Sequence, residues 1–81
     1  MRVTVRLFAR LRDIAGVGEL TRDLPPDATA GTVWDLLVAE FAELRAYTPA
    51  ISVAVNADYA RMDARLGDGD EVAFLPPVSG G

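Results

Sequence analysis

The last six residues of this 81-residue sequence, Pro76-Pro77-Val78-Ser79-Gly80-Gly81, form the segment that could do chemistry. Two prolines cannot continue a central strand and hold the chain extended, so six residues reach about 20 Å from the body of the protein. Gly80 and Gly81 lack a Cβ atom and can enter a slot that is too narrow for any other residue. The reactive group that we expect at the tip is the ionised carboxylate of Gly81.

A carboxylate is a poor electrophile, so Gly81 must first be converted to a derivative such as an acyl-adenylate before a nucleophile can attack it. The sequence has no cysteine and no histidine, which excludes a cysteine nucleophile, a thiolate zinc site and the commonest general base. It also has no phosphate-binding glycine loop. We therefore expect no bound cofactor and no metal, with ATP used by a separate activating enzyme. The two glycines alone leave an alternative, a chain end without a chemical role.

The charges narrow the class of partner. Twelve acidic residues against eight arginines give a net charge of −4, and there is no lysine. An acidic domain without a basic run binds nucleic acid poorly, and no apolar stretch approaches the ~18–20 residues of a membrane span. The arginines at positions 2, 6, 10 and 12 alternate with apolar residues and are interpreted as a solvated face. We expect a cytoplasmic protein with neither a nucleic-acid nor a membrane partner.

Several strands and one main helix must position the tail. The opening segment, Arg2–Phe8, alternates polar and apolar residues and predicts a strand with one buried face. One or two helical turns are predicted over Ala9–Ala15. Further strands are predicted at Glu19–Leu24, Ile51–Val55, Tyr59–Ala60 and Glu71–Leu75, with turns at Asn56–Asp58 and Leu66–Asp70.

The main helix is predicted over Thr32–Leu44. Thr32 is a suitable N-cap, and Asp35 three residues later resembles the second half of a capping box. Trp34 lies in the first turn and is expected to close the edge of the core. Apolar residues at helical spacing form one stripe, which consists of Val33, Leu36, Leu37, Phe41 and Leu44.

This order of elements predicts a two-layer α+β domain over residues 1–75, followed by a flexible, reactive C-terminal tail at 76–81. The domain has a mixed sheet of about five strands with the helix packed on one face. The first and last strands lie side by side in the middle of the sheet. The periodicity gives the elements, whereas the strand order comes from analogy with the ubiquitin-like β-grasp fold.

The whole chain resembles the small-subunit family of molybdopterin synthase, the sulfur carriers of molybdenum-cofactor biosynthesis. The resemblance lies in Val5–Arg12, in Thr32–Leu37 and above all in Leu66–Gly81. The last of these stretches matches the family's ending almost throughout. The spacing departs from the family's pattern in the Ala28–Gly31 stretch, which carries no family chemistry.

The resemblance implies that an E1-like adenylyltransferase, related to ubiquitin-activating enzymes, adenylates Gly81. Sulfur from a donor of the desulfurase or rhodanese type then replaces the adenylate and gives a thiocarboxylate. The tail inserts into the large subunit of molybdopterin synthase, where cyclic pyranopterin monophosphate becomes molybdopterin. The resemblance further implies a heterotetramer whose catalytic residues lie on the large subunit, so that this chain is a sulfur-carrying co-substrate.

Three large apolar side chains are predicted to form a docking patch near the root of the tail: Phe8, Tyr59 and Leu75. By alternation, Phe8 and Leu75 point to solvent from adjacent central strands, on the sheet face opposite the helix. Such a patch on a small acidic protein favours a docking surface, although scattered surface hydrophobes are common. The predicted partner-binding set also includes Pro76, Pro77, Val78 and Ser79.

Three alternatives remain at this stage. The first is a carrier of the same fold that serves thiamine, cysteine or tRNA thiolation, although the Pro-Pro-Val-Ser-Gly-Gly ending and the chain length favour the molybdopterin branch. The second is a ubiquitin-like modifier that is joined to lysines of target proteins. The third is a non-covalent binding domain with an idle tail.

Overall fold

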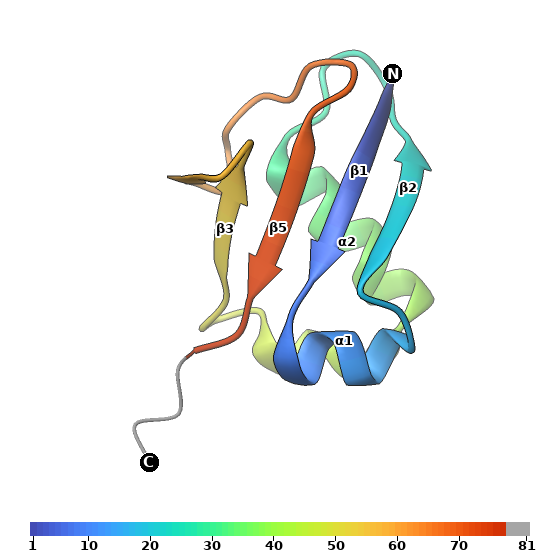
Figure 1. Ribbon diagram of the computed structural model, residues 1–81, viewed down its shortest axis with the longest axis vertical. Helices are drawn as coiled ribbons and strands as arrows, with labels where there is room; N and C mark the ends of the chain where they lie inside the picture. Colours follow the sequence, from blue (N-terminus) through green and yellow to red (C-terminus); the bar gives the residue numbers. More distant parts are fainter. Residues whose placement is uncertain (78–81) are drawn as a thin grey trace.

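The computed structural model describes residues 1–77, which contain five strands, two α-helices and one 3-10 helix (Figure 1). The elements are β1 (Arg2–Leu7), α1 (Ala9–Ala15), β2 (Glu19–Asp23), α2 (Ala30–Glu40), the 3-10 helix η1 (Ala42–Tyr47), β3 (Ser52–Val55), β4 (Asp58–Ala60) and β5 (Glu71–Leu75). Each predicted segment is present, with shifted boundaries at several ends.

The five strands form one mixed sheet in the order β2-β1-β5-β3-β4. The central strands β1 and β5 are parallel, and Leu7 pairs with Phe74. The remaining neighbours are antiparallel. Figure 1 shows α2 lying across one face of the sheet, with α1 at the end where β5 finishes. The predicted α+β class, with the first and last strands adjacent in a β-grasp arrangement, is confirmed.

The core lies between the sheet and α2, and the predicted inward positions of the two central strands are confirmed. Val3, Val5 and Leu7 of β1 are buried, as are Val72 and Phe74 of β5. Alternation also predicts that Ile51, Val53 and Val55 point inward. Of these only Val53 is buried and the other two are half-buried, because β3 lies nearer the edge of the sheet than β1 and β5. Burial of these side chains is the main driving force for folding.

Trp34 is part of this core and does not merely close its edge. Its side chain is 2% exposed, and its ring centroid lies 5.1 Å from that of Phe74. The indole N–H donates a hydrogen bond of 2.9 Å to the Thr48 hydroxyl oxygen. This bond satisfies the one polar group of the indole, so the ring can be buried without a desolvation penalty.

The predicted start of the main helix at Thr32 is wrong by one turn. The N-cap is Thr29, whose hydroxyl accepts from the Thr32 N–H, while the Thr32 hydroxyl accepts from the Thr29 N–H. The N–H groups of Ala30 and Gly31 donate to the carbonyls of residues 64 and 62 at 3.0 and 2.7 Å. A loop that is distant in sequence therefore accepts the hydrogen bonds of the first helical turn. The local sequence does not reveal this contact.

The predicted end of the helix and one member of its stripe are also wrong. The α-helix ends at Glu40, and a 3-10 helix continues to Tyr47. Leu44 is nevertheless buried in the core. Leu36 is 42% exposed and lies off the buried face that Val33 and Leu37 share.

The tail is described only at its root. Pro76 and Pro77 follow β5, whereas the predicted flexible and reactive residues Val78, Ser79, Gly80 and Gly81 lie outside the described residues. Within residues 1–77, no helix combines the length and the apolar character that crossing a membrane requires.

Candidate functional site

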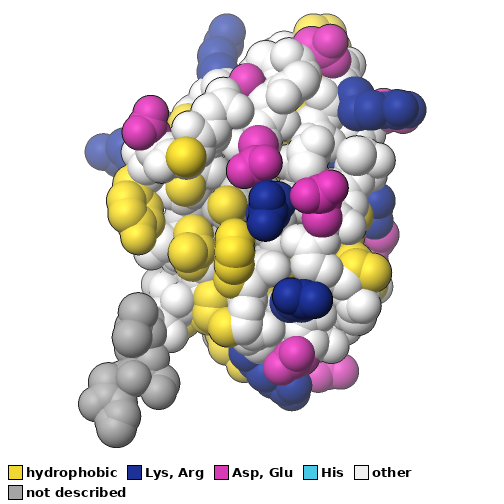
Figure 2. Space-filling model, in the orientation of Figure 1, with side chains coloured by type: hydrophobic (Ala, Val, Ile, Leu, Met, Phe, Trp, Pro, Cys, Tyr) yellow, Lys and Arg dark blue, Asp and Glu magenta, His cyan; other side chains and the backbone are white. Residues whose placement is uncertain are grey.

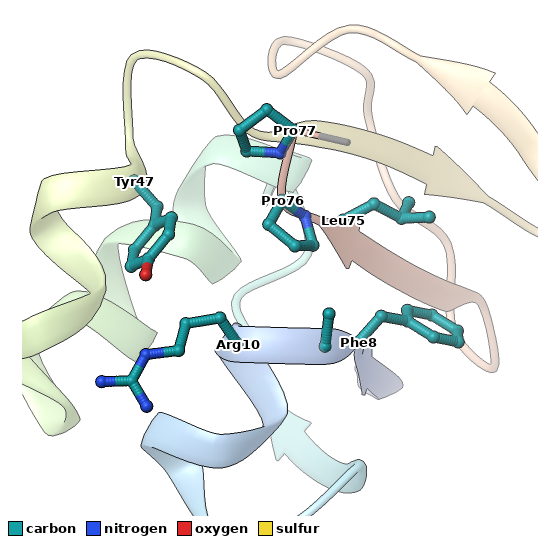
Figure 3. A pocket seen from close by; sticks show the side chains of 7 residues that line it. Phe8, Arg10, Tyr47, Leu75, Pro76 and Pro77 are labelled. Carbon is teal, nitrogen blue, oxygen red and sulfur yellow. The ribbon is translucent and has the colours of Figure 1, made fainter. Parts of the chain in front are cut away.

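An open groove lies at the root of the tail, where β5 ends beside the start of α1. Its volume is about 610 Å³. Figure 3 shows Tyr47 and Arg10 on one side of Pro76, with Phe8 and Leu75 on the other. The lining residues are Phe8, Ala9, Arg10, Tyr47, Leu75, Pro76 and Pro77. Apolar side chains dominate this set, so the groove is suited to binding an apolar segment.

Phe8 owes its position to the sharp change of direction between β1 and α1. It is the N-cap of α1 with φ −123° and ψ 154°, and its carbonyl accepts from the Leu11 N–H at 3.1 Å. The next residue, Ala9, has φ +51°, a left-handed conformation that costs a residue with a Cβ atom about 1–2 kcal/mol. The strand therefore ends at Leu7, one residue earlier than predicted, and Phe8 lies in the bend that follows. The Phe8 side chain is 39% exposed.

Leu75 is the last residue of β5 and forms another wall of the groove. It pairs with Ser52 of β3, and its side chain is half-buried. The prediction that Leu75 points fully to solvent is therefore only partly right. Pro76 is also half-buried, and Pro77 is exposed. The described part of the tail thus leaves the domain along an apolar surface.

Tyr59 shares the sheet face of the groove but does not line it. The register pairs Tyr59 with Ala54, and Ala54 in turn with Ala73 of β5. Tyr59 is 81% exposed. Figure 2, which shows this face, has apolar side chains over β3 and β5 and charged side chains over β1 and β2. The predicted patch is therefore a band across the sheet, with Phe8 and Leu75 at the groove and Tyr59 farther along.

Arginine charges border the groove beside Phe8. The Arg6 guanidinium carbon lies 5.7 Å from the Phe8 ring centroid, in cation–π geometry. Arg6 also pairs with Glu19 at 3.9 Å and with Glu71 at 3.8 Å, so its charge is balanced. Arg10 is exposed and lines the groove itself. The site therefore combines an apolar floor with a cationic rim.

Sequence reasoning missed three residues of the groove: Ala9, Arg10 and Tyr47. Arg10 was interpreted as part of a solvated face, and Tyr47 was not singled out. Tyr47 ends η1 and packs partly against the core. The helix type after residue 41 decides where this side chain lies, and no local signal in the sequence gives that. Four predicted site residues, Val78 to Gly81, lie outside the described residues.

Residues 5–81 match the ThiS family. This chain belongs to the ThiS family. The molybdopterin synthase sulfur carrier subunit of Arabidopsis thaliana is 37% identical over 79 residues, which cover 98% of this chain and 82% of that protein. The match of this ThiS-family chain runs through the β-grasp domain and onward through the Pro76–Gly81 segment.

Solved structures support the same assignment. Small archaeal modifier protein 1 (SAMP1) of Haloferax volcanii superposes with a TM-score of 0.85 at 32% identity, covering 100% of both chains. A chain in the crystal structure of the Amycolatopsis orientalis BexX/CysO complex has a TM-score of 0.72 at 29% identity, covering 98% of this chain and 99% of that one. This chain is thus similar to a molybdopterin synthase sulfur carrier subunit, to a small archaeal modifier protein and to a chain of the BexX/CysO complex.

Proposed function

We propose that this chain is the sulfur carrier subunit of molybdopterin synthase. The observation that carries the proposal is the apolar groove at the root of the tail, found in a ThiS-family chain similar to a sulfur carrier subunit. An extended segment that leaves the domain beside an exposed apolar surface can be held by a partner while its tip reaches into that partner's active site.

The chemistry proposed for the tip is an activation followed by a transfer. An E1-like adenylyltransferase joins the Gly81 carboxylate to AMP from ATP and releases pyrophosphate. A persulfide on a donor of the desulfurase or rhodanese type then attacks the acyl-adenylate and displaces AMP, which gives an acyl disulfide with the donor. A thiol reductant cleaves the S–S bond of this intermediate and leaves a thiocarboxylate on Gly81. In the large subunit the thiocarboxylate sulfur bonds to cyclic pyranopterin monophosphate, and water then hydrolyses the acyl–sulfur bond, which leaves the sulfur on the pterin and restores the Gly81 carboxylate. The catalytic residues of this last step are proposed to lie on the large subunit.

The β-grasp domain contributes recognition to this cycle. Phe8, Leu75 and the two prolines present apolar surface that the partner can cover, and Tyr59 extends this surface across the sheet. Covering apolar area stabilises the complex by about 25 cal/mol per Å² before the cost of association is subtracted.

The test is reconstitution with purified components. The chain is incubated with the adenylyltransferase, ATP, the sulfur donor and a thiol reductant, and its intact mass is measured. We expect one oxygen to be exchanged for sulfur. Addition of the large subunit and cyclic pyranopterin monophosphate should then yield molybdopterin. A thiocarboxylated chain that yields no molybdopterin from cyclic pyranopterin monophosphate would contradict the proposal.

A protein modifier is the second candidate, and the likeness to small archaeal modifier protein 1 favours it. It predicts an isopeptide bond between Gly81 and lysines of other proteins in the presence of the activating enzyme. Mass spectrometry of branched peptides after digestion distinguishes this outcome from the thiocarboxylate.

A further inference from the structure

Docking of an apolar segment does not explain why a charged residue, Arg10, lines the groove. Its side chain lines the groove together with Phe8, Leu75 and the two prolines. Within residues 1–77, five ion pairs join other arginines to acidic residues, and none of them includes Arg10. An exposed cation is thus held at the rim of an apolar surface.

The local electrostatics of α1 gives no reason for a cation at this position. Arg10 is the second residue of α1, and the first turn of this helix has no acidic residue. The N-terminal end of a helix carries partial positive charge, so a cation there is disfavoured. A side chain that works against its own helix is more readily explained by an external contact than by folding.

Arg6 differs from Arg10 in this respect. Its guanidinium lies between the carboxylates of Glu19 and Glu71, at 3.9 and 3.8 Å, and beside the ring of Phe8. Two negative charges already balance it. Arg10 rather than Arg6 can therefore offer its charge to a partner.

We propose that Arg10 binds a carboxylate on a segment of the large subunit whose neighbouring apolar side chain occupies the groove. This inference rests on the proposed function, since it specifies the partner segment for the same surface. Local charge complementarity supports it: although the chain carries a net charge of −4, Arg10 is an exposed cation outside the five ion pairs of residues 1–77 and attracts a carboxylate at the groove. Figure 3 shows Arg10 and Tyr47 on one side of Pro76 and Leu75 and Phe8 on the other, with the Arg10 guanidinium directed outward, away from Leu75 and Phe8. The cation therefore lies at the outer rim of the groove, where a partner segment can reach it.

The experiment is calorimetric titration of the purified large subunit with the full-length chain, at about 50 and about 300 mM NaCl. At low salt, Arg10→Gln should weaken binding about threefold to tenfold, and Arg10→Glu by tenfold or more, because a like charge then faces the partner. Both differences should shrink at high salt. Arg65→Gln is the matched control, since it removes the same charge from an exposed residue beside the start of α2 that does not line the groove.

The outcomes separate this inference from the function on which it rests. Equal affinity of the wild type and Arg10→Glu at low salt would overturn it, and so would an equal loss in Arg65→Gln and Arg10→Gln. If Phe8→Asp abolishes binding while Arg10→Glu does not weaken it, the carrier function stands and the role of Arg10 is rejected. If the wild type does not bind the large subunit at all, both proposals fail. Thermal melts of both Arg10 variants confirm that each is folded.

Discussion

The two ends of the sheet differ in whether their surface side chains have partners within the protein. At the end away from the tail, the Asp70 carboxylate accepts from the Asn56 side-chain amide at 2.9 Å and from the Gly67 N–H at 2.7 Å. The Oδ1 atom of the Asn56 side chain accepts from the Glu71 N–H at 2.9 Å. At the tail root, apolar side chains and the Arg10 cation border an open groove. At the end away from the tail the polar groups are hydrogen-bonded to one another, whereas at the tail root the apolar side chains and Arg10 are accessible to a partner.

This difference separates stability from recognition in space. The network of Asp70 and Asn56 ties the β3–β4 turn to the turn before β5, so changes there should act on folding. Changes at the groove should act on binding, because its side chains are exposed or half-buried and leave no cavity in the core.

The largest expected effect concerns the tip of the tail. Deletion of Gly81, or Gly80→Phe, should lower thiocarboxylate formation by more than about 100-fold, because the reacting carboxyl group is displaced or blocked. The free energy of unfolding should stay within about 0.5 kcal/mol of the wild type, since no core residue changes. Intact mass after the charging reaction and denaturant unfolding check the two parts. Normal molybdopterin synthesis by the truncated chain would refute the assignment of Gly81.

The next effect concerns the groove walls. Phe8→Asp should weaken binding to the large subunit by about 100-fold, because the groove loses its aromatic wall and the complex would have to desolvate a carboxylate. Leu75→Asp should do the same and should also lower Tm, since Leu75 is half-buried. Tyr59→Asp is the comparison on the same face. It should weaken binding to the large subunit only about threefold, because Tyr59 lies outside the groove. Wild-type affinity in the Phe8 variant would exclude the docking surface.

A smaller effect is expected at the opposite end, and it depends on pH. Hydrogen bonds from Gly67 and then Asn56 hold the pKa of Asp70 below its ordinary value of 3.8. A carboxylate whose pKa is lower in the folded state stabilises the fold above its unfolded pKa, and this contribution is lost as the pH falls through the folded value. Stability of the wild type should therefore decline below about pH 4–5.

Asp70→Asn should lower the free energy of unfolding at pH 7 by about 1–2 kcal/mol and flatten this decline, with binding to the large subunit unchanged. Denaturant unfolding across pH checks it. Asp35→Asn, on the exposed side of α2, is the matched control. Equal pH profiles for the wild type and Asp70→Asn would show that the network does not contribute.

The smallest effect concerns the β3–β4 turn. Asn56 and Ala57 have φ values of +50° and +73°, and the turn connects two antiparallel strands. Ala57→Gly should raise the free energy of unfolding by about 0.5–1 kcal/mol, because glycine adopts this conformation without steric cost. Binding should not change. A loss of stability in this variant would mean that the entropy of the unfolded chain outweighs the relief of strain.

The sequence predicted the strands better than the helix. Alternation along residues 2–8 and 71–75 located both central strands and their buried positions, because one solvated face and one buried face impose a period of two. The main helix was placed one turn late, since the loop at residues 62–64 satisfies its first N–H groups. Phe8 and Leu75 were found in advance, whereas Tyr47 and the role of Arg10 at the groove were not.

The sequence by itself determined the elements, the fold class and the ending that places the chain in its family. These depend on short-range patterns of burial and on the chemistry of individual residues. The tertiary structure alone decided that η1 brings Tyr47 opposite Leu75 and that Arg6 is balanced by Glu19 and Glu71 while Arg10 is exposed at the groove. Such relations join residues that are far apart along the chain, and packing of the core fixes them.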